Sequence, residues 1–121
     1  MNGRVLLDTN AIIYGLNAGL IFPNAEYCIS IITEMELFAY AKLTPVDREN
    51  ITNLLTHFTI FNIDDGVKNK TIEIRINHGV KLPDSIICAT SIVHQATLIS
   101  NDKQLSKVKE LNILTLEKWL G

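Results

Sequence analysis

Short apolar runs alternate with segments of helical periodicity along this chain of 121 residues, and this alternation limits the fold more than any other feature. The runs that we expect to be strands lie at residues 4–7, 27–30, 59–63, 97–100 and 113–116. Strands that alternate with helices pair in parallel, and strands with few polar side chains are covered on both faces of their sheet. The sequence therefore predicts an α/β fold: a three-layer α/β/α sandwich with a short central parallel sheet.

Helical segments fill the intervals between the expected strands. Apolar residues at three- and four-residue spacing predict helices at residues 10–16, 32–43, 45–57, 83–94 and 103–111, with a last helical turn at 117–120. Thr44 and Pro45 suit the N-cap and the first position of one helix. Asp64 or Asp65 can cap a further helix, which Gly79 ends. Since no repeat or linker interrupts the pattern, we expect a single domain over residues 1–121.

The composition indicates a folded chain outside the membrane. Hydrophobic residues make up 47% and the mean hydropathy is +0.19, which excludes a disordered chain. No apolar run approaches the roughly 20 residues of a membrane span, and we recognise no secretion signal. Cys28 and Cys88 lie far apart in apolar surroundings, so we expect buried free thiols and a cytoplasmic location.

The charge balance gives no basic surface for tight, non-specific binding of nucleic acid. The formal net charge is −2 and the isoelectric point is near 5.9. A nucleic-acid substrate remains compatible with this balance, because divalent cations held by carboxylates supply positive charge toward phosphate.

Acidic residues follow the expected strands or begin the helices next to them. Asp8 and Asp102 follow two strands, Glu36 lies early in the helix after a third, and Asp84 begins the most apolar helix. Ligands of parallel sheets bind beyond the carboxyl ends of the strands, so these acids are expected at one edge. Carboxylates at such an edge suit Mg²⁺ and Mn²⁺, which activate water and stabilise the oxygens of a phosphoryl displacement.

Each acid also has a simpler structural interpretation. Asp8 and Asp102 can be helix caps, and Asp84 can be a first-turn acid favoured by the helix dipole. A lone glutamate on a helix is usually solvated, and periodicity alone does not separate Glu36 from Glu34. The coincidence of all four acids at matching places favours a site over four unrelated caps.

The chain resembles the PIN-domain family, and most of all the VapC-type ribonuclease toxins of prokaryotic toxin–antitoxin pairs. The stretches that carry this resemblance are LLDTNAII, ISIITEMELFAYAKL, KLPDSIICATSIVHQATLISNDKQL and LNILTL. They occur in the family's order and cover nearly the whole chain. The interval between Asp8 and Glu36 looks short for the family, which implies a trimmed first helical hairpin.

The family's first two acids fall on Asp8 and Glu36. Asp8 stands in the D-T-N/S motif that follows the family's first strand. The second acid belongs to an S-x-x-T-x-x-E-L pattern, which begins here at Ser30 and Thr33. That pattern selects Glu36 over Glu34.

The other two family acids fall on Asp84 and Asp102. Asp84 stands in an L-P-D-A/S stretch, and Asp102 comes two residues after Ser100, which closes a strand. The resemblance also implies supporting roles for Asn10, beside the first acid, and for Ser100.

By this resemblance the chain is a metal-dependent endoribonuclease that hydrolyses RNA phosphodiester bonds. Asp8, Glu36, Asp84 and Asp102 are both the expected catalytic residues and the ligands of one or two Mg²⁺ or Mn²⁺ ions. The implied partners are RNA, a second copy of the chain and an antitoxin protein, with no membrane. The alternatives are a PIN-fold nuclease of RNA processing or a non-catalytic module that binds nucleic acid or protein.

Other polar side chains receive structural interpretations. His57, His78 and His94 stand at expected helix ends, and the proposed chemistry needs no histidine as general base. Lys103, next to Asp102, is a candidate RNA contact, although a solvated lysine is the favoured interpretation.

Overall fold

A five-stranded parallel sheet forms the centre of the molecule. The computed structural model describes residues 3–19, 21–40 and 42–121. The strands are ordered β3-β2-β1-β4-β5 and every neighbouring pair is parallel. Their bounds are β1 (Arg4–Leu7), β2 (Glu26–Ser30), β3 (Thr59–Phe61), β4 (Ala96–Ile99) and β5 (Ile113–Leu114).

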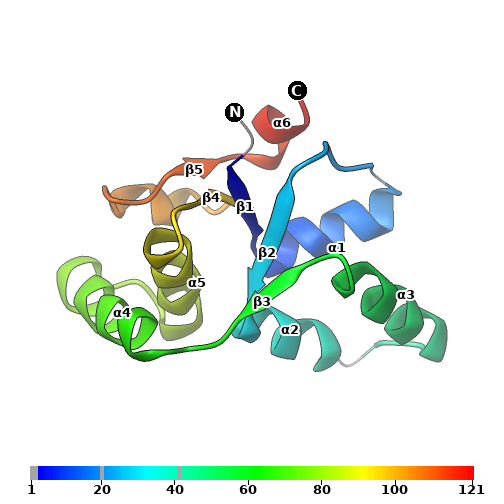
Figure 1. Cartoon of the computed structure of the whole chain (residues 1–121), viewed down its shortest axis with the longest axis horizontal. Coiled ribbons are helices and arrows are strands. Elements are labelled where there is room, and N and C mark those ends of the chain that lie inside the picture. The colour runs from blue at the N-terminus through cyan, green and yellow to red at the C-terminus, as the bar shows by residue number, and fades with distance from the viewer. Residues whose placement is uncertain (1–2, 20, 41) are drawn as a thin grey trace.

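Helices cover both faces of the sheet, so the predicted three-layer α/β/α arrangement is confirmed (Figure 1). One face carries α4 (Asp65–His78) and α5 (Leu82–Val93). The other carries α1 (Thr9–Ala18), α2 (Ile31–Phe38) and α3 (Pro45–Leu55), and the short α6 (Leu116–Leu120) follows β5. No helix in the described part of the chain is long and apolar enough to cross a membrane.

The alternation of side chains along β1 divides the core into two clusters. Leu6 packs into the cluster beneath α4 and α5, with Ile74 and Ile87. Val5 and Leu7 point to the opposite face and join the cluster beneath α1, α2 and α3. Both faces of the strand are therefore buried, as its apolar sequence predicts.

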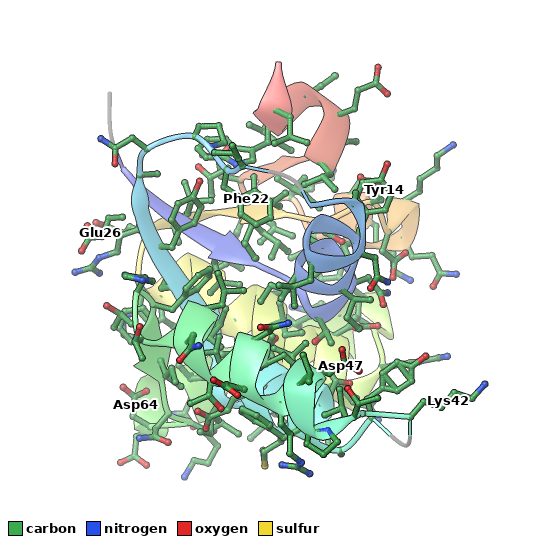
Figure 2. All side chains as sticks on the ribbon, turned by 90° about the vertical axis from the view of Figure 1, so that its right-hand side faces the viewer. Tyr14, Phe22, Glu26, Lys42, Asp47 and Asp64 are labelled. Atoms are coloured by element: carbon green, nitrogen blue, oxygen red, sulfur yellow. The ribbon has the colours of Figure 1, made fainter. Side chains whose placement is uncertain are left out.

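The face formed by α1, α2 and α3 is seen in Figure 2. Tyr14 on α1 is 57% exposed and Lys42 reaches outward, whereas Phe22 lies inward against the apolar cluster. Within residues 3–19 and 21–40, α1 is the only helix between β1 and β2. That this connection is trimmed relative to the family stays a prediction.

Several predicted element ends agree with the structure. Thr44 caps α3 and forms a reciprocal capping box with Asp47, and Pro45 opens the helix. Asp64, rather than Asp65, caps α4 through a hydrogen bond from the Val67 amide. Gly79 ends that helix with a φ of 63°, a left-handed conformation that favours glycine.

The helix predicted at 32–43 is wrong in its extent, because α2 ends at Phe38. The predicted helix also spans residue 41, which lies outside the described residues. Arg48 donates a hydrogen bond to the Phe38 carbonyl, and the following Tyr40 is 50% exposed. The helix therefore ends at Phe38, where a polar contact from α3 satisfies one of the last carbonyls.

The helix predicted at 103–111 is also wrong: only a short 3₁₀ helix, η1 (Lys103–Lys107), forms there. The buried residues Leu105, Val108 and Leu111 are three positions apart, which matches the 3₁₀ repeat. The amide of each donates to the carbonyl three residues earlier, at 3.0–3.2 Å. The expected strands at 59–63 and 113–116 shorten to β3 and β5.

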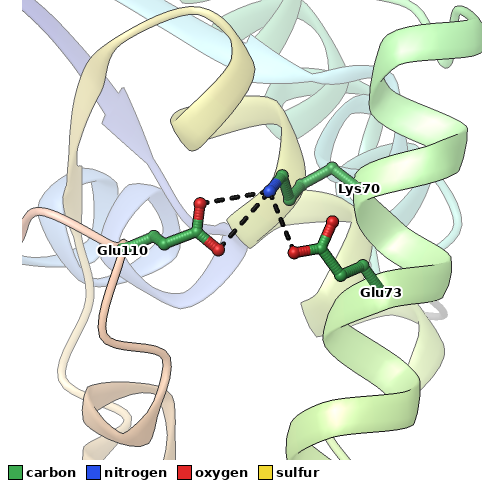
Figure 3. A network of polar contacts seen from close by, with 3 residues as sticks. All are labelled: Lys70, Glu73 and Glu110. Atoms are coloured by element: carbon green, nitrogen blue, oxygen red, sulfur yellow. Dashed lines mark hydrogen bonds and ion pairs between the residues drawn. The ribbon is translucent and has the colours of Figure 1, made fainter.

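The segment after η1 is held to α4 by a charged contact (Figure 3). Lys70 Nζ lies 3.1 Å from Glu110 Oε2 and 3.3 Å from Glu73 Oε1. These contacts raise the pKa of the Lys70 ammonium. The irregular segment is thus anchored at its charged end as well as through its buried apolar residues.

Candidate functional site

Asp8 lies at the carboxyl edge of the sheet, at the end of its central strand. Its amide donates to the Ile99 carbonyl at 3.2 Å, which continues the pairing of β1 with β4. Asp8 Oδ1 accepts a hydrogen bond from the Ala11 amide at 2.8 Å and caps α1. The cap interpretation therefore applies to one carboxylate oxygen, and the second oxygen is not used by this cap.

Asp102 reaches the same edge from β4. The Ser100 hydroxyl accepts a hydrogen bond from the Asp102 amide at 3.1 Å, and Asp102 Oδ1 accepts one from the Gln104 amide at 3.0 Å. The Ser100 side chain is only 3% exposed, and its hydroxyl lies near enough to the Asp8 carboxyl to lower the pKa of that group. Ser100 thus joins the acid after β1 to the acid after β4.

Asp84 is the third residue of α5, and its carboxylate is partly buried. Burial raises the pKa of Asp84, and the negative charges of Asp102 and Glu36 raise it further, while Lys81 lowers it. Asp84 is therefore near enough to acids from two other segments to interact with them electrostatically.

Glu36 is exposed on α2 and is connected to the same region through α1. Thr9 Oγ1 donates to Glu36 Oε1 at 2.6 Å and lies 3.3 Å from the Thr33 hydroxyl. Thr9 belongs to the D-T-N motif, which implies support for the Asp8 carboxylate, but nothing in the motif indicates that its hydroxyl contacts Glu36 instead.

Negative charges interact across the whole site. Burial is the main cause that raises the pKa of Asp8, and the charges of Asp84 and Asp102 add to it. Hydrogen bonds from Ser100 and Ala11 act in the opposite direction. Among the residues that the structure describes, none of the four acids has a Lys or Arg within ion-pair distance. Cations would relieve this repulsion.

The donor set fits a hard divalent cation in chemistry, since all four candidate ligands are carboxylates. In residues 3–19, 21–40 and 42–121, however, no three Asp, Glu, His or Cys side chains gather closely enough to hold one metal ion as they stand. Binding would therefore draw the carboxylates together, against a repulsion that the cation itself removes.

The two expected supporting residues differ in their contacts. Ser100 contacts both Asp8 and Asp102, as described above. Asn10 is exposed in the first turn of α1, and its side chain makes no hydrogen bond to another described residue. In this conformation the structure does not bring Asn10 onto Asp8, and Thr9 makes the polar link to another acid instead.

The three histidines make their contacts with residues other than these acids. His57 is exposed, and His78 ends α4. His94 follows α5 and stacks on Phe61, with ring centroids 3.6 Å apart and ring planes at 8°. Arg4 donates to the His94 carbonyl at 3.1 Å, while His94 Nε2 has no partner among the described residues.

His94 should make stability depend on pH. Burial lowers its pKa, and Arg4 lowers it further, while Asp64 acts in the opposite direction. A base with a lowered folded pKa contributes stability above its unfolded pKa, about 6.5, that is lost as the pH falls through the folded pKa. We expect acid to reduce the free energy of unfolding more in the wild type than in His94→Phe, which keeps the stacking on Phe61.

Urea unfolding at a series of pH values below neutrality checks this expectation. His57→Phe, at an exposed position, serves as the control and should retain the wild-type slope. Parallel pH profiles for the wild type and His94→Phe would contradict the assignment to His94.

Comparison with known proteins identifies the family. The family model described as the PIN domain matches residues 5–111. The chain belongs to the PIN domain family. No curated protein matches the sequence.

Solved structures similar to this PIN domain include chains of toxin–antitoxin complexes. A chain from a toxin–antitoxin complex of Klebsiella pneumoniae is 30% identical, with a TM-score of 0.76, over 93% of this chain and 97% of that one. A chain of VapBC2 from Rickettsia felis, bound to a promoter DNA fragment, is 20% identical, with a TM-score of 0.80, over 93% and 98%. A chain of DNA-bound VapBC from Salmonella typhimurium is 18% identical, with a TM-score of 0.81, over 94% and 98%. The last two likenesses establish the fold.

Proposed function

We propose that this PIN domain is a metal-dependent endoribonuclease and the toxin of a VapBC-type toxin–antitoxin pair. The observation that carries the proposal is electrostatic: acids from four separate segments interact at one edge of the sheet, and none of them forms an ion pair with a basic side chain in the described residues. Carboxylate groups brought together without a counter-charge are costly unless they bind a cation.

We assign the metal ligands to Asp8, Glu36, Asp84 and Asp102, for one or two Mg²⁺ or Mn²⁺ ions. When bound, a divalent cation supplies Lewis acidity, which acidifies water and neutralises charge that develops on a phosphate during displacement. The chain's own task is to hold the carboxylates ionised and oriented.

Two hydroxyl side chains serve this orientation. The Ser100 hydroxyl lowers the pKa of Asp8, which favours the ionised carboxylate, and it accepts a hydrogen bond from the Asp102 amide, which fixes the turn after β4. Thr9 donates to Glu36. Supporting contacts of this kind normally set the geometry and affinity of a metal site.

The partners follow from the solved relatives and from the surface. The Klebsiella chain was solved in a toxin–antitoxin complex, and the VapBC complexes from Rickettsia felis and Salmonella typhimurium were solved on DNA. We propose an antitoxin as the protein partner and a homodimer as the assembly. Tyr14, Met35 and Tyr40 are each at least half exposed on or near α1 and α2, which supports a protein contact there. Leu37, Ile51 and Leu55 on α2 and α3 are buried in the core and are not free for such a contact.

The buried free thiols of Cys28 and Cys88 support action in a reducing compartment, the cytoplasm. Burial raises the pKa of each thiol to about 12, so both are inert as nucleophiles.

A second candidate function is a binding module without catalysis. It is favoured by the open arrangement of the acids, since no three potential ligands are gathered in the described residues. A module of this kind would bind RNA or a partner protein without needing a cation.

Cleavage of an RNA panel tests the proposal. The purified protein, free of any antitoxin, is incubated with structured and single-stranded RNAs and with single-stranded DNAs of the same sequences. We expect cleavage of RNA with Mg²⁺ or Mn²⁺ and none with EDTA. RNA binding without cleavage at any metal concentration would favour the binding module, and cleavage of DNA alone would contradict the ribonuclease assignment.

A further inference from the structure

A groove of about 310 Å³ opens beside Asp102, between η1 and the segment formed by β5 and the start of α6. Its volume is at the lower end of the range for small-ligand sites, roughly 300–1,000 Å³. Ser100 and Asp102 line the groove and also belong to the acidic edge described above. The groove is therefore continuous with the candidate active site.

The sign of the charge reverses along this groove. Beyond Asp102 it is lined by Lys103 and Lys118, which are both exposed. Neither ammonium has a carboxylate within ion-pair distance in the described part of the chain, unlike Lys68, which pairs with Asp65. Two cations are thus available to an anion next to the acidic edge.

Neutral donors and an apolar floor complete the lining. Asn101 Oδ1 accepts a hydrogen bond from the Leu116 amide at 2.9 Å, so its oxygen is fixed and its two N–H donors stay without a partner among described residues. Thr115 offers a hydroxyl, and Ile113 and Leu114 supply apolar surface. Cationic and neutral donors above an apolar surface suit a nucleotide, which carries both a phosphate and an aromatic base.

We propose that this groove binds one nucleotide of an RNA strand next to the cleaved bond. Lys103 and Lys118 contact its phosphate, Asn101 donates to the phosphate or the sugar, and the base lies along the apolar edge strand β5. The strand then passes from the basic side of the groove to the acidic edge at Asp102. The proposal rests on the proposed ribonuclease function and names a substrate subsite for it.

The chain order explains why the sequence indicates Lys103 as a candidate RNA contact but does not indicate the subsite as a whole. Lys118 is separated from Lys103 by η1 and β5, and each alone reads as a solvated lysine. The two meet only because β5 pairs with β4, which brings α6 beside the residues after β4.

Fluorescence anisotropy of a short, labelled single-stranded RNA tests the subsite, with EDTA present to prevent cleavage and low ionic strength to limit screening. The variants are Lys103→Ala and Lys118→Ala. Lys68→Ala is the matched control, because it removes the same charge from α4, away from the groove. Thermal melting of each variant establishes that it is folded.

We expect either groove variant to weaken RNA binding about five- to tenfold, with Lys68→Ala within about twofold of the wild type. Each lost phosphate contact should reduce the slope of log K against log salt by about 0.7 for a single strand. Lys118→Arg should retain binding, because arginine also binds phosphate. Asn101→Asp keeps the acceptor for Leu116 but loses the donors and adds repulsion, so it should weaken binding more than either alanine variant.

Two results would overturn the subsite. If wild-type protein binds and cleaves RNA while the groove variants match Lys68→Ala, the subsite is wrong and the ribonuclease stands. If wild-type protein neither binds nor cleaves RNA, the proposed function fails and the subsite fails with it.

Discussion

An Asp8→Asn variant is expected to lose RNA cleavage by about a thousandfold or more while keeping its fold. Removal of a metal-binding carboxylate costs several kcal/mol of transition-state stabilisation, and each 1.36 kcal/mol is about a factor of ten in rate. The fold should persist, because asparagine is an equally good N-cap and can accept the hydrogen bond from the Ala11 amide. The measurement is the single-turnover rate of RNA cleavage at saturating Mn²⁺.

Asp64→Asn provides the matched control for this variant. Asp64 caps α4 through a hydrogen bond from the Val67 amide at 2.9 Å, just as Asp8 caps α1, but it is exposed and away from the four acids. The two substitutions are chemically identical, so a difference between them reports on the site rather than on capping. Equal activity of Asp8→Asn and Asp64→Asn would contradict the assignment of Asp8.

Millimolar Mn²⁺ is expected to raise the melting temperature of the wild-type protein by roughly 10 °C. A ligand at about 100 times its Kd adds about 2.7 kcal/mol to the free energy of unfolding, and a chain of this size gains several degrees per kcal/mol. The acids of the site repel one another when no cation is bound, so a cation should stabilise the fold through this edge of the sheet. Differential scanning fluorimetry across a Mn²⁺ titration measures the shift.

The Asp8→Asn variant distinguishes Mn²⁺ binding at the four acids from weak Mn²⁺ binding elsewhere on the protein. Without metal it should melt at or above the wild-type temperature, because burial and neighbouring charges already raise the pKa of Asp8. With Mn²⁺ its shift should fall to a fraction of the wild-type shift, whereas Asp64→Asn should shift fully. Equal shifts in all three proteins would place the bound ion outside the four acids.

The parts of the fold that the sequence predicts are those set by local chemistry. β1 follows from the three apolar residues after Arg4, Thr44 and Pro45 define the start of α3, and Gly79 defines the end of α4. The end of α2 and the 3₁₀ form of η1 could not be found in this way. Both depend on tertiary contacts: Arg48 on the Phe38 carbonyl in one case, and the three-residue spacing of buried side chains in the other.

In the candidate site, too, the sequence predicts what local chemistry sets and does not predict what depends on tertiary contacts. Strand ends and the family resemblance select Asp8, Glu36, Asp84 and Asp102, because parallel strands place their carboxyl ends at one edge. The contact of Thr9 with Glu36 could not be predicted, since it joins two helices that are separate in the chain. Whether the four acids bind metal stays a prediction.

The bond between Thr9 and Glu36 has a consequence for how the two sides of the site move. Asp8 and Ser100 directly follow the central strands β1 and β4, and their amides continue the pairing of the sheet, where amide protons exchange with solvent only when much of the molecule unfolds. Glu36 is exposed, and a single hydroxyl donor holds it against competition from water, so its release costs only about 1 kcal/mol. The side of the site that carries Asp8 and Ser100 therefore stays fixed unless much of the molecule unfolds. The Glu36 side chain on the other side can change rotamer within nanoseconds. The cleft can reshape itself around an incoming ion without disturbing the sheet that supports it.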